Sequence, residues 1–228
     1  MYYLCNMNNK PHIIVEPTAD GSATLFVKEL DEHYHSVKGA ITESQHIYRD
    51  SAFLHRSDGT PIRLLEVGFG TGLNAVVTAM EADEQHPVHY ISLEKYPLEA
   101  QLLTTLAHDA IVDPTLLRAI HDAQWNTPIP ITPYFTIEKR ISDYLVDPLP
   151  QSIDVVYFDA FAPDKQPEMW TPKAFARLYD CLNIGAVLTT YCAKGEIRRL
   201  LSSLGLTVER LSGPKNGKRE ILRATREK

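Results

Sequence analysis

A glycine-rich loop stands between an apolar segment and a helix-like segment in the first half of the chain. It reads Glu66-Val-Gly68-Phe-Gly70-Thr-Gly72-Leu-Asn74. Glycines let a backbone turn sharply and approach a ligand, and the N–H groups at a helix start can bind one. A dinucleotide loop would need glycine at position 73 and a P-loop would need Gly-Lys-Ser/Thr, and the sequence has neither. The loop therefore indicates another ligand or, alternatively, a tight turn without one.

Three acidic residues follow predicted strands, which is where open α/β sheets bind ligands. Glu94 ends a strand 22 residues after Gly72, and its carboxylate could accept both hydroxyls of a ribose. Asp143 follows the next strand and either contacts an adenine amine or caps a short helix. Asp159 follows the most apolar strand, which we expect at the centre of a parallel sheet. These positions predict one ligand site along the carboxyl edge of the sheet.

The segment that begins at Asp159 is the most distinctive in the chain. It reads Asp159-Ala-Phe161-Ala-Pro-Asp-Lys-Gln166-Pro-Glu-Met-Trp170. The prolines stiffen the loop, and the rings of Phe161 and Trp170 offer faces on which a nucleobase could stack. The alternative is that these rings pack the loop onto the sheet, which we expect of at least one of them.

Apolar periodicity predicts strands alternating with helices from residue 62 onward. Strands are expected at 62–67, 88–93, 131–137, 153–158, 186–190, 207–211 and 220–224, and helices at 73–82, 97–108, 173–182 and 196–204, with a short helical turn at 142–146. Alternation implies a mostly parallel α/β sheet, but the last two strands are joined by a turn alone and must pair antiparallel. The prediction is a seven-stranded sheet closed by an antiparallel hairpin over 61–228, with 1–60 as an N-terminal extension over the site that holds a strand near 24–27.

The net charge of −6 does not by itself indicate nucleic-acid binding, but the charge is uneven. Residues 194–228 hold ten Lys and Arg against four Asp and Glu, whereas residues 1–193 hold 13 against 25. A basic face on an acidic body suits a polyanion held at one edge, and a solvated basic tail is the alternative. Three cysteines without CxxC spacing argue against a disulfide framework or a zinc site. Short apolar runs and an N-terminus without a signal pattern predict a cytoplasmic protein that does not enter a membrane.

The glycine loop and the segment from Asp159 to Trp170 together resemble the MnmC-type tRNA methyltransferase family. The loop with its preceding acid is similar to those that bind S-adenosylmethionine, and the second segment is the more specific motif. The resemblance extends to residues 20–22, 33–36, 43–44 and 218–220, so it covers nearly the whole chain. Gln166 departs from the asparagine of the bacterial pattern but retains an amide.

This resemblance implies the Rossmann-like class I methyltransferase architecture, with 61–228 as the cofactor-binding domain. It implies methyl transfer from S-adenosylmethionine to the amine of a 5-aminomethyluridine at the wobble position of tRNA. Because a flavin-dependent oxidase follows in two-domain members, the chain resembles the stand-alone form, and a separate oxidase or other modification partner is expected. Cofactor contacts are expected from Glu66, Gly68, Gly70, Gly72, Asn74, Glu94, Lys95, Asp143 and Asp159.

Asp159 is expected to be the catalytic residue, which orients the amine and accepts its proton directly or through water. By the resemblance, Tyr34 and Ser36 would close over the methyl group and the base. Phe161 and Trp170 are the expected aromatic contacts of that base. Contacts to tRNA phosphates, which position the substrate, are expected from Lys194, Arg198, Arg199, Lys215, Lys218 and Arg219.

A few other residues could suggest a different chemistry. Methylation at a pyrimidine C5 needs a cysteine nucleophile, whereas an amine attacks a methyl group directly, so Cys192 is interpreted as a small buried residue. His33, His35 and His46 show no diagnostic metal-ligand spacing, and we expect no metal. The alternative functions are a methyltransferase or aminopropyltransferase of a small amine, and a non-catalytic binding module that retained the fold.

Overall fold

The computed structural model describes residues 12–56, 59–106, 112–215 and 217–227. Cys5 and the other residues of the N-terminal segment 1–11 lie outside these ranges. Within them, no helix has the length and apolar character needed to cross a membrane.

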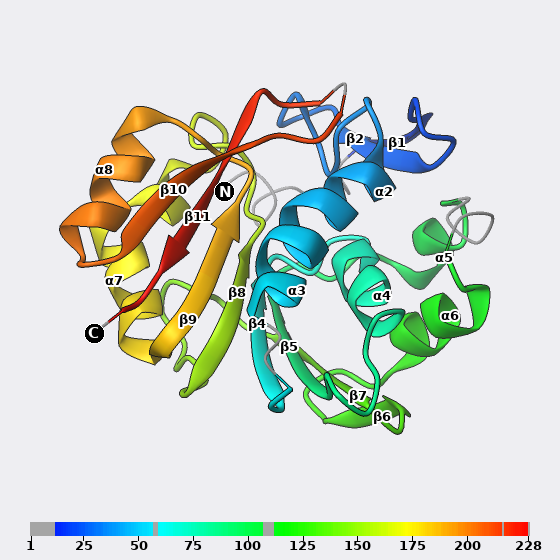
Figure 1. Cartoon of the computed structure of the whole chain (residues 1–228). Coiled ribbons are helices and arrows are strands. Elements are labelled where there is room, and N and C mark those ends of the chain that lie inside the picture. The colour runs from blue at the N-terminus through cyan, green and yellow to red at the C-terminus, as the bar shows by residue number, and fades with distance from the viewer. Residues whose placement is uncertain (1–11, 57–58, 107–111, 216, 228) are drawn as a thin grey trace.

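An eight-stranded sheet forms the centre of the molecule, in the order β10-β11-β9-β8-β4-β5-β7-β6 (Figure 1). The strands β7, β5, β4, β8 and β9 run parallel, β11 is antiparallel to both β9 and β10, and β6 is antiparallel to β7. This confirms the predicted, mostly parallel sheet with its antiparallel C-terminal hairpin. The bounds are β4 (Ile62–Val67), β5 (Val88–Glu94), β6 (Ile129–Thr132), β7 (Phe135–Ile141), β8 (Ile153–Phe158), β9 (Leu182–Thr190), β10 (Thr207–Ser212) and β11 (Glu220–Thr225).

The third predicted strand is wrong in detail, because the segment 131–137 is the corner of a hairpin and not one strand. Pro133 and Tyr134 form a turn between β6 and β7. Proline has no N–H to give a strand ladder and favours turns, although the apolar run continues across it. The sheet therefore has eight strands where seven were predicted, and β7 ends at Ile141, shortly before Asp143.

Helices cover both faces of the sheet, and each face has its own apolar layer. The first layer includes Leu64 and Tyr157, and the second includes their sequence neighbours Leu65 and Phe158. Successive residues of a strand point to opposite faces, so fully apolar strands bury both. Packed on the first face are α4 (Leu73–Ala79) and α6 (Pro114–Asp122), and on the second α7 (Pro172–Cys181) and α8 (Gly195–Ser203) (Figure 1).

Not every helix matches its prediction. The helix expected over 97–108 is confined to α5 (Ala100–Leu103) in the described residues, and α6 was not predicted. Asp113 caps α6 by accepting hydrogen bonds from Thr115 N–H and Leu116 N–H, with Pro114 in the first turn. The helical turn expected at 142–146 is a hydrogen-bonded turn that Asp147 N–H closes on the Asp143 carbonyl.

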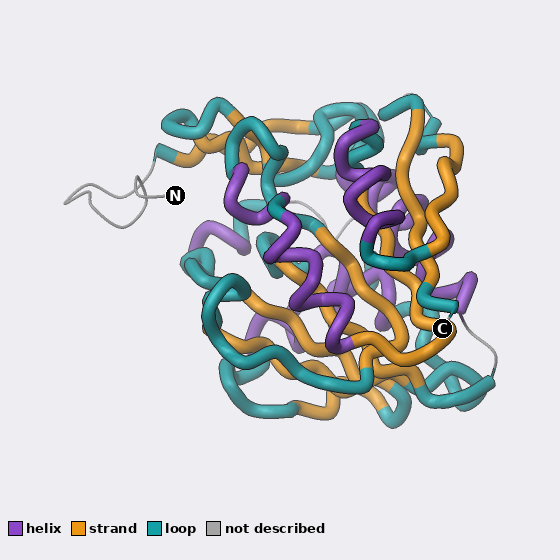
Figure 2. Tube along the Cα trace, turned by 90° about the vertical axis from the view of Figure 1, so that its left-hand side faces the viewer, coloured by secondary structure: helices purple, strands orange, loops and turns teal. Residues whose placement is uncertain are grey.

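The described residues that precede β4 occupy two different settings. A small antiparallel sheet of β1 (Ile13–Pro17), β2 (Ala23–Val27) and β3 (Glu32–His33) lies beyond the carboxyl ends of the parallel strands, as the two views show (Figures 1 and 2). The strand predicted near 24–27 is β2. A continuous helix follows, made of α2 (Ala40–Glu43), a π-helical segment η1 (Ser44–Phe53) and α3 (Leu54–Arg56), and its apolar side belongs to the first core layer.

Candidate active site

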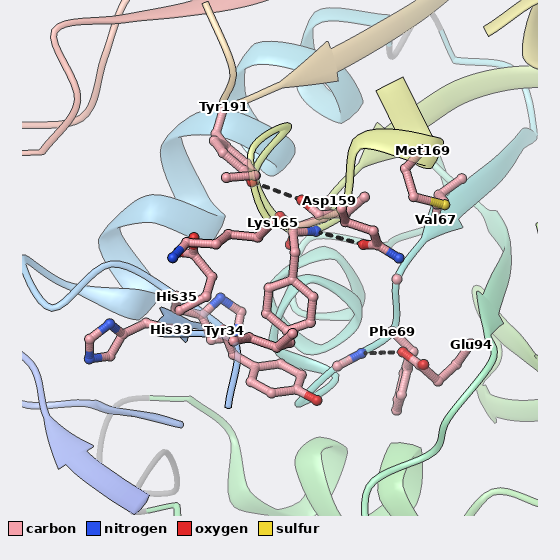
Figure 3. Close-up of a pocket in the computed structure, with 18 of the residues that line it drawn as sticks. His33, Tyr34, His35, Val67, Phe69, Glu94, Asp159, Lys165, Met169 and Tyr191 are labelled. Atoms are coloured by element: carbon pink, nitrogen blue, oxygen red, sulfur yellow. Dashed lines mark hydrogen bonds between the residues drawn. The ribbon is translucent and has the colours of Figure 1, made fainter. Parts of the chain in front are cut away.

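A cavity of about 340 Å³ opens at the carboxyl ends of the parallel strands. Its wall combines the glycine loop, the ends of β5, β7 and β8, and the segment 30–37 that contains β3 (Figure 3). Of the residues predicted to bind cofactor or substrate, those that line it are Tyr34, Ser36, Gly68, Gly70, Glu94, Lys95, Asp143, Asp159, Phe161 and Lys218. The topology therefore brings together residues that lie far apart in the sequence.

The two glycines of the loop that line the cavity leave no room for a side chain. Gly68 has φ +94°, and a Cβ there would lie 2.7 Å from the carbonyl oxygen of Asp159. Gly70 has φ +51°, and its Cβ would lie 3.0 Å from the ring of Tyr34. Glycine is the residue that adopts positive φ without strain, so both positions need it. The loop thus presents bare backbone to the cavity.

Glu94 stands at the end of β5, beside this loop. Its carboxylate accepts a hydrogen bond from Gly70 N–H at 3.1 Å, the dashed line at Glu94 in Figure 3, and another from Tyr96 N–H at 2.9 Å. Each carboxylate oxygen has two lone pairs, so both oxygens retain one for a ligand. The side chain is half-buried and faces the cavity, where it can accept two hydroxyl groups.

Asp143 and Lys95 neutralise each other in the wall of the cavity. Lys95 Nζ donates to Asp143 Oδ2 at 2.6 Å, and Leu145 N–H donates to Asp143 Oδ1 at 3.0 Å. Although burial acts in the opposite direction, the hydrogen bond from Lys95 lowers the pKa of Asp143. Asp143 was predicted either to contact an adenine amine or to cap a short helix. Its position is compatible with both, since its side chain accepts from Leu145 N–H in the turn and also lines the cavity.

Asp159 is half-buried, and donors hold its carboxylate from both sides. The hydroxyl of Tyr48 donates to Oδ1 at 2.6 Å, and Asn74 Nδ2 donates to Oδ2 at 2.8 Å. Burial raises the pKa of Asp159 to about 7, the hydrogen bond from Tyr48 opposes this, and the nearby charge of Glu43 adds to the rise. The carboxylate is therefore fixed in orientation and changes charge near neutral pH.

Glu66, Asn74 and Gly72 lie behind the cavity wall and not in it. Glu66 is fully buried and accepts hydrogen bonds from Ser92 Oγ at 2.6 Å and Asn74 Nδ2 at 3.0 Å. Burial raises the pKa of Glu66 to about 8. Because Asn74 donates to both Glu66 and Asp159, it connects the glycine loop to the end of β8. Direct contacts to the cofactor were expected from all three residues, but their positions behind the wall do not provide such contacts.

The two aromatic residues of the 159–170 loop have different roles. Phe161 lines the cavity, where its ring meets that of Tyr34 edge-on at 5.1 Å. Trp170, in the short helix η3 (Pro167–Trp170), is 6% exposed and packs on Phe158 in the core. Its indole N–H donates to the Phe161 carbonyl at 2.8 Å. The base-facing role expected of Trp170 is corrected, since this residue fixes the loop that presents Phe161.

Of the basic residues predicted to contact phosphate, Lys218 is the one that reaches the cavity. Its Nζ lies 3.6 Å from the centre of the Tyr191 ring. Lys194 pairs with Asp164 at 3.4 Å, and the side chains of both reach solvent. The other predicted phosphate contacts lie outside the cavity wall. Arg198 is half-buried, and Arg199, Lys215 and Arg219 are exposed.

Tyr48 and Glu43 are among the residues at the site that the sequence did not single out as site residues. Tyr48 carries no motif and lies 111 positions from Asp159, to which it donates. Glu43 is part of the family resemblance but gave no sign of lining the cavity, which it does. The interpretation of Cys192 agrees with its place in the second core layer, at 5% exposure.

The histidines of the N-terminal region each have a separate setting. His33 Nε2 lies 3.1 Å from Glu16 Oε2, His35 Nε2 lies 2.7 Å from Thr71 Oγ1, and His46 Nε2 lies 2.8 Å from the Ser212 carbonyl. In the described ranges, no three His, Cys, Asp or Glu side chains gather as metal ligands would.

Comparisons with known proteins agree with this geometry. Residues 136–227 match a family described as S-adenosyl-L-methionine-dependent methyltransferase. A "tRNA 5-methylaminomethyl-2-thiouridine biosynthesis bifunctional protein MnmC" from Pseudomonas fluorescens is 34% identical over 218 residues, which is 85% of this chain. The MnmC protein of Cupriavidus metallidurans is 29% identical over 222 residues, or 90% of this chain. The chain is similar to one part of these MnmC proteins.

This chain spans about a third of the length of those MnmC proteins, 33% for Cupriavidus metallidurans and 32% for Pseudomonas fluorescens. Among solved structures, MNMC2 from Aquifex aeolicus superposes with a TM-score of 0.74 at 24% identity, covering 96% of this chain and 72% of that one. The spermidine synthase of Thermotoga maritima superposes with a TM-score of 0.58 at 15% identity, covering 95% of this chain and 74% of that one. These likenesses confirm the class I methyltransferase fold.

Proposed function

We propose that this chain transfers a methyl group from S-adenosylmethionine to the amine of a 5-aminomethyluridine at the tRNA wobble position. The names of its MnmC relatives and the description of the matched family support this assignment. The observation that carries it is Asp159, a carboxylate held by Tyr48 and Asn74 beside the glycine loop. A carboxylate there can hold an amine next to a cofactor bound at the loop.

The residues present fit S-adenosylmethionine. Gly68 and Gly70 bring backbone to the cavity wall at positions where a Cβ would press on Asp159 and Tyr34, and Glu94 keeps two acceptor lone pairs toward the cavity. In this proposal, Glu94 holds the ribose hydroxyls and Asp143 lies near the adenine. When bound, the cofactor supplies a methyl group made electrophilic by its positive sulfur.

The protein's own part in the reaction is mainly positioning. Alignment of nucleophile and electrophile contributes strongly to such displacements. Asp159 receives hydrogen bonds from the amine and fixes its direction, and Tyr48 and Asn74 keep the carboxylate from rotating. Phe161 and Tyr34 offer aromatic surface to the base at the cavity wall.

Residues 1–60 were predicted to form an extension over the site, and we assign this covering role to β1–β3 and the segment that continues to Val37. Residues 30 and 32–37 line the cavity, whereas the helix from Ala40 to Arg56 contributes mainly to the core. We also propose that the protein acts in the cytoplasm, where its RNA substrate is found. A separate flavin-dependent oxidase would be its partner in the modification.

The basic side chains outside the cavity give a prediction about tRNA. Replacing Lys215 and Arg219 by Glu should weaken tRNA binding, because such residues neutralise phosphates. The slope of log affinity against log salt should fall by about one for each phosphate that the variant no longer neutralises. Filter binding across salt concentrations measures this, with S-adenosylhomocysteine affinity, expected to stay constant, as the control. Unchanged tRNA affinity and salt slope would show that the segment between β10 and β11, which holds Lys215 and Arg219, is a solvated surface that does not contact tRNA.

A small amine is the second candidate substrate. The cavity wall carries Glu32, Glu43 and Asp159, and three carboxylates suit a free cationic amine. Salt dependence separates the candidates, because a small amine makes no set of phosphate contacts and should lack the steep slope of tRNA.

The experiment that tests the proposed function is nucleoside mass spectrometry of tRNA from cells with and without this protein. Loss of the protein should deplete 5-methylaminomethyluridine nucleosides and accumulate the 5-aminomethyl precursor. An unchanged tRNA nucleoside profile would argue against the proposal and favour the small-amine candidate.

A further inference from the structure

Glu43 is a nearly buried carboxylate that faces the cavity and that neither cofactor binding nor amine positioning uses. It is 8% exposed and lines the cavity. Ser36 N–H donates to its Oε2 at 2.8 Å. Over the described part of the chain, no hydrogen bond reaches its Oε1. Among the described residues, Oε1 is not one of the buried side-chain atoms that lack a hydrogen bond, so it is open to the cavity, where a group of the substrate can reach it.

The N-terminal motif at residues 20–22 explains how Glu43 is placed. Asp20 Oδ2 accepts hydrogen bonds from Thr42 N–H and Thr42 Oγ1, both at 2.9 Å. Its Oδ1 accepts from Thr18 Oγ1 and from Ser22 N–H. Although burial acts in the opposite direction, these donors hold the pKa of Asp20 well below its usual range. Asp20 therefore anchors α2 one residue before Glu43.

Asp159 and Glu43 differ in how many donors they already hold. Both oxygens of Asp159 receive a hydrogen bond, from Tyr48 and from Asn74, and such donors favour the charged form. Glu43 receives one, from Ser36. Glu43 therefore has an oxygen that no described residue bonds and that can take up a proton, while the lone pairs left on Asp159 hold the amine.

The acceptor amine must lose a proton before it can attack. An alkylamine has a pKa near that of lysine, about 10.4, so it is mostly an ammonium ion at neutral pH and has no free lone pair. Asp159 alone favours this unreactive form, because a carboxylate stabilises a neighbouring cation. A second group is needed to remove the proton.

We propose that Glu43 accepts the proton of the acceptor ammonium while Asp159 holds the nitrogen in place. The proposal rests on the proposed function. The N–H bond breaks, its electron pair stays on nitrogen and an O–H bond forms at Glu43 Oε1. The nitrogen lone pair then forms the N–CH₃ bond as the S–CH₃ bond breaks, with that electron pair remaining on sulfur. The proton leaves Glu43 for solvent when the product departs.

The surroundings of Glu43 suit this role. Burial raises its pKa, which makes it a stronger base than an exposed glutamate, and the charge of Lys218 opposes the rise. The titratable and charged groups that face it from the surrounding elements are Glu32 in β3, Tyr48 in η1, Asp159 after β8, Tyr191 after β9 and Lys218 between β10 and β11.

The test compares two acceptors in single-turnover methylation by Glu43→Gln. One is an anticodon stem-loop RNA with 5-aminomethyluridine, and the other carries an aminooxymethyl group, a much weaker base that is neutral at neutral pH. With the alkylamine, the variant should be slower by about 10²–10³-fold, as for loss of a general base. With the aminooxy acceptor, it should be within a few-fold of the wild type, since no proton needs removal.

A purely structural role for Glu43 would slow both acceptors equally, and that result, or no loss with either, would overturn the inference alone. Absence of transfer by the wild-type chain would overturn the proposed function and this inference with it. Affinity for S-adenosylhomocysteine reports whether the variant folds, and if it does not bind, Glu43→Asp carries the same comparison. Glu84→Gln, at an exposed position outside the cavity wall, is the matched control and should behave as wild type.

Discussion

Asp159→Asn is expected to slow methyl transfer by about 10²–10⁴-fold in a single turnover, the range for groups that orient or exchange protons with a reacting atom. Asparagine retains an oxygen that can accept from Tyr48, so the fold should persist. It lacks the negative charge that holds the amine. The measurement is single-turnover methylation of undermodified tRNA with both substrates saturating.

The pH profile and cofactor affinity give this prediction its controls. Because the pKa of Asp159 is about 7, raising the pH through neutrality converts it to the carboxylate, and the wild-type rate should rise there. The rate of Asp159→Asn should lack the part of this rise that comes from Asp159, while its affinity for S-adenosylhomocysteine stays within a few-fold of wild type. A near-wild-type rate would remove Asp159 from the mechanism. A loss confined to cofactor affinity would make it a ligand for the cofactor.

Glu94→Ala is expected to weaken S-adenosylhomocysteine binding by about 1.5–3 kcal/mol, the cost of removing one side of charge-assisted hydrogen bonds. This corresponds to roughly 10- to 150-fold in the dissociation constant. The physical reason is the orientation of Glu94, whose oxygens are fixed by Gly70 N–H and Tyr96 N–H and keep lone pairs for ribose hydroxyls. Titration calorimetry measures the change.

Glu138→Ala is the matched control for this experiment. Glu138 is a half-buried glutamate on the neighbouring strand β7, outside the cavity wall, where it pairs with Arg140. Its replacement should leave the affinity for S-adenosylhomocysteine unchanged. Equal affinity of Glu94→Ala and the wild type would show that the ribose lies elsewhere.

Local sequence patterns predicted the parts of the site that depend on neighbours in the chain. Gly68, Gly70 and Glu94 lie at the ends of apolar strands, and the carboxyl ends of parallel strands meet at one edge. Asp159 follows β8, which pairs with β4, so the same rule placed it beside the glycine loop. The central strands and the antiparallel hairpin were predictable for the same reason.

Residues whose roles depend on distant packing could not be predicted from local patterns. Tyr48 reaches Asp159 because a helix from the first 60 residues packs on the sheet, and no spacing in the sequence indicates that contact. Trp170 was expected either to face a base or to pack the loop onto the sheet, and it packs, as was expected of at least one of the two rings. Which of the two rings would pack could not be read from the loop sequence. Glu66 was expected to touch the cofactor, yet its side chain is fully buried, because a strand alternates its faces.

The most direct test of the central claim is methyl transfer by the purified chain from labelled S-adenosylmethionine to an anticodon stem-loop RNA that contains 5-aminomethyluridine. We expect nucleoside mass spectrometry to find the label in 5-methylaminomethyluridine. We also expect transfer to depend on Asp159, and on Glu94 at limiting cofactor. Label that appears in a free small amine but not in the RNA, or in neither, would contradict the proposed function.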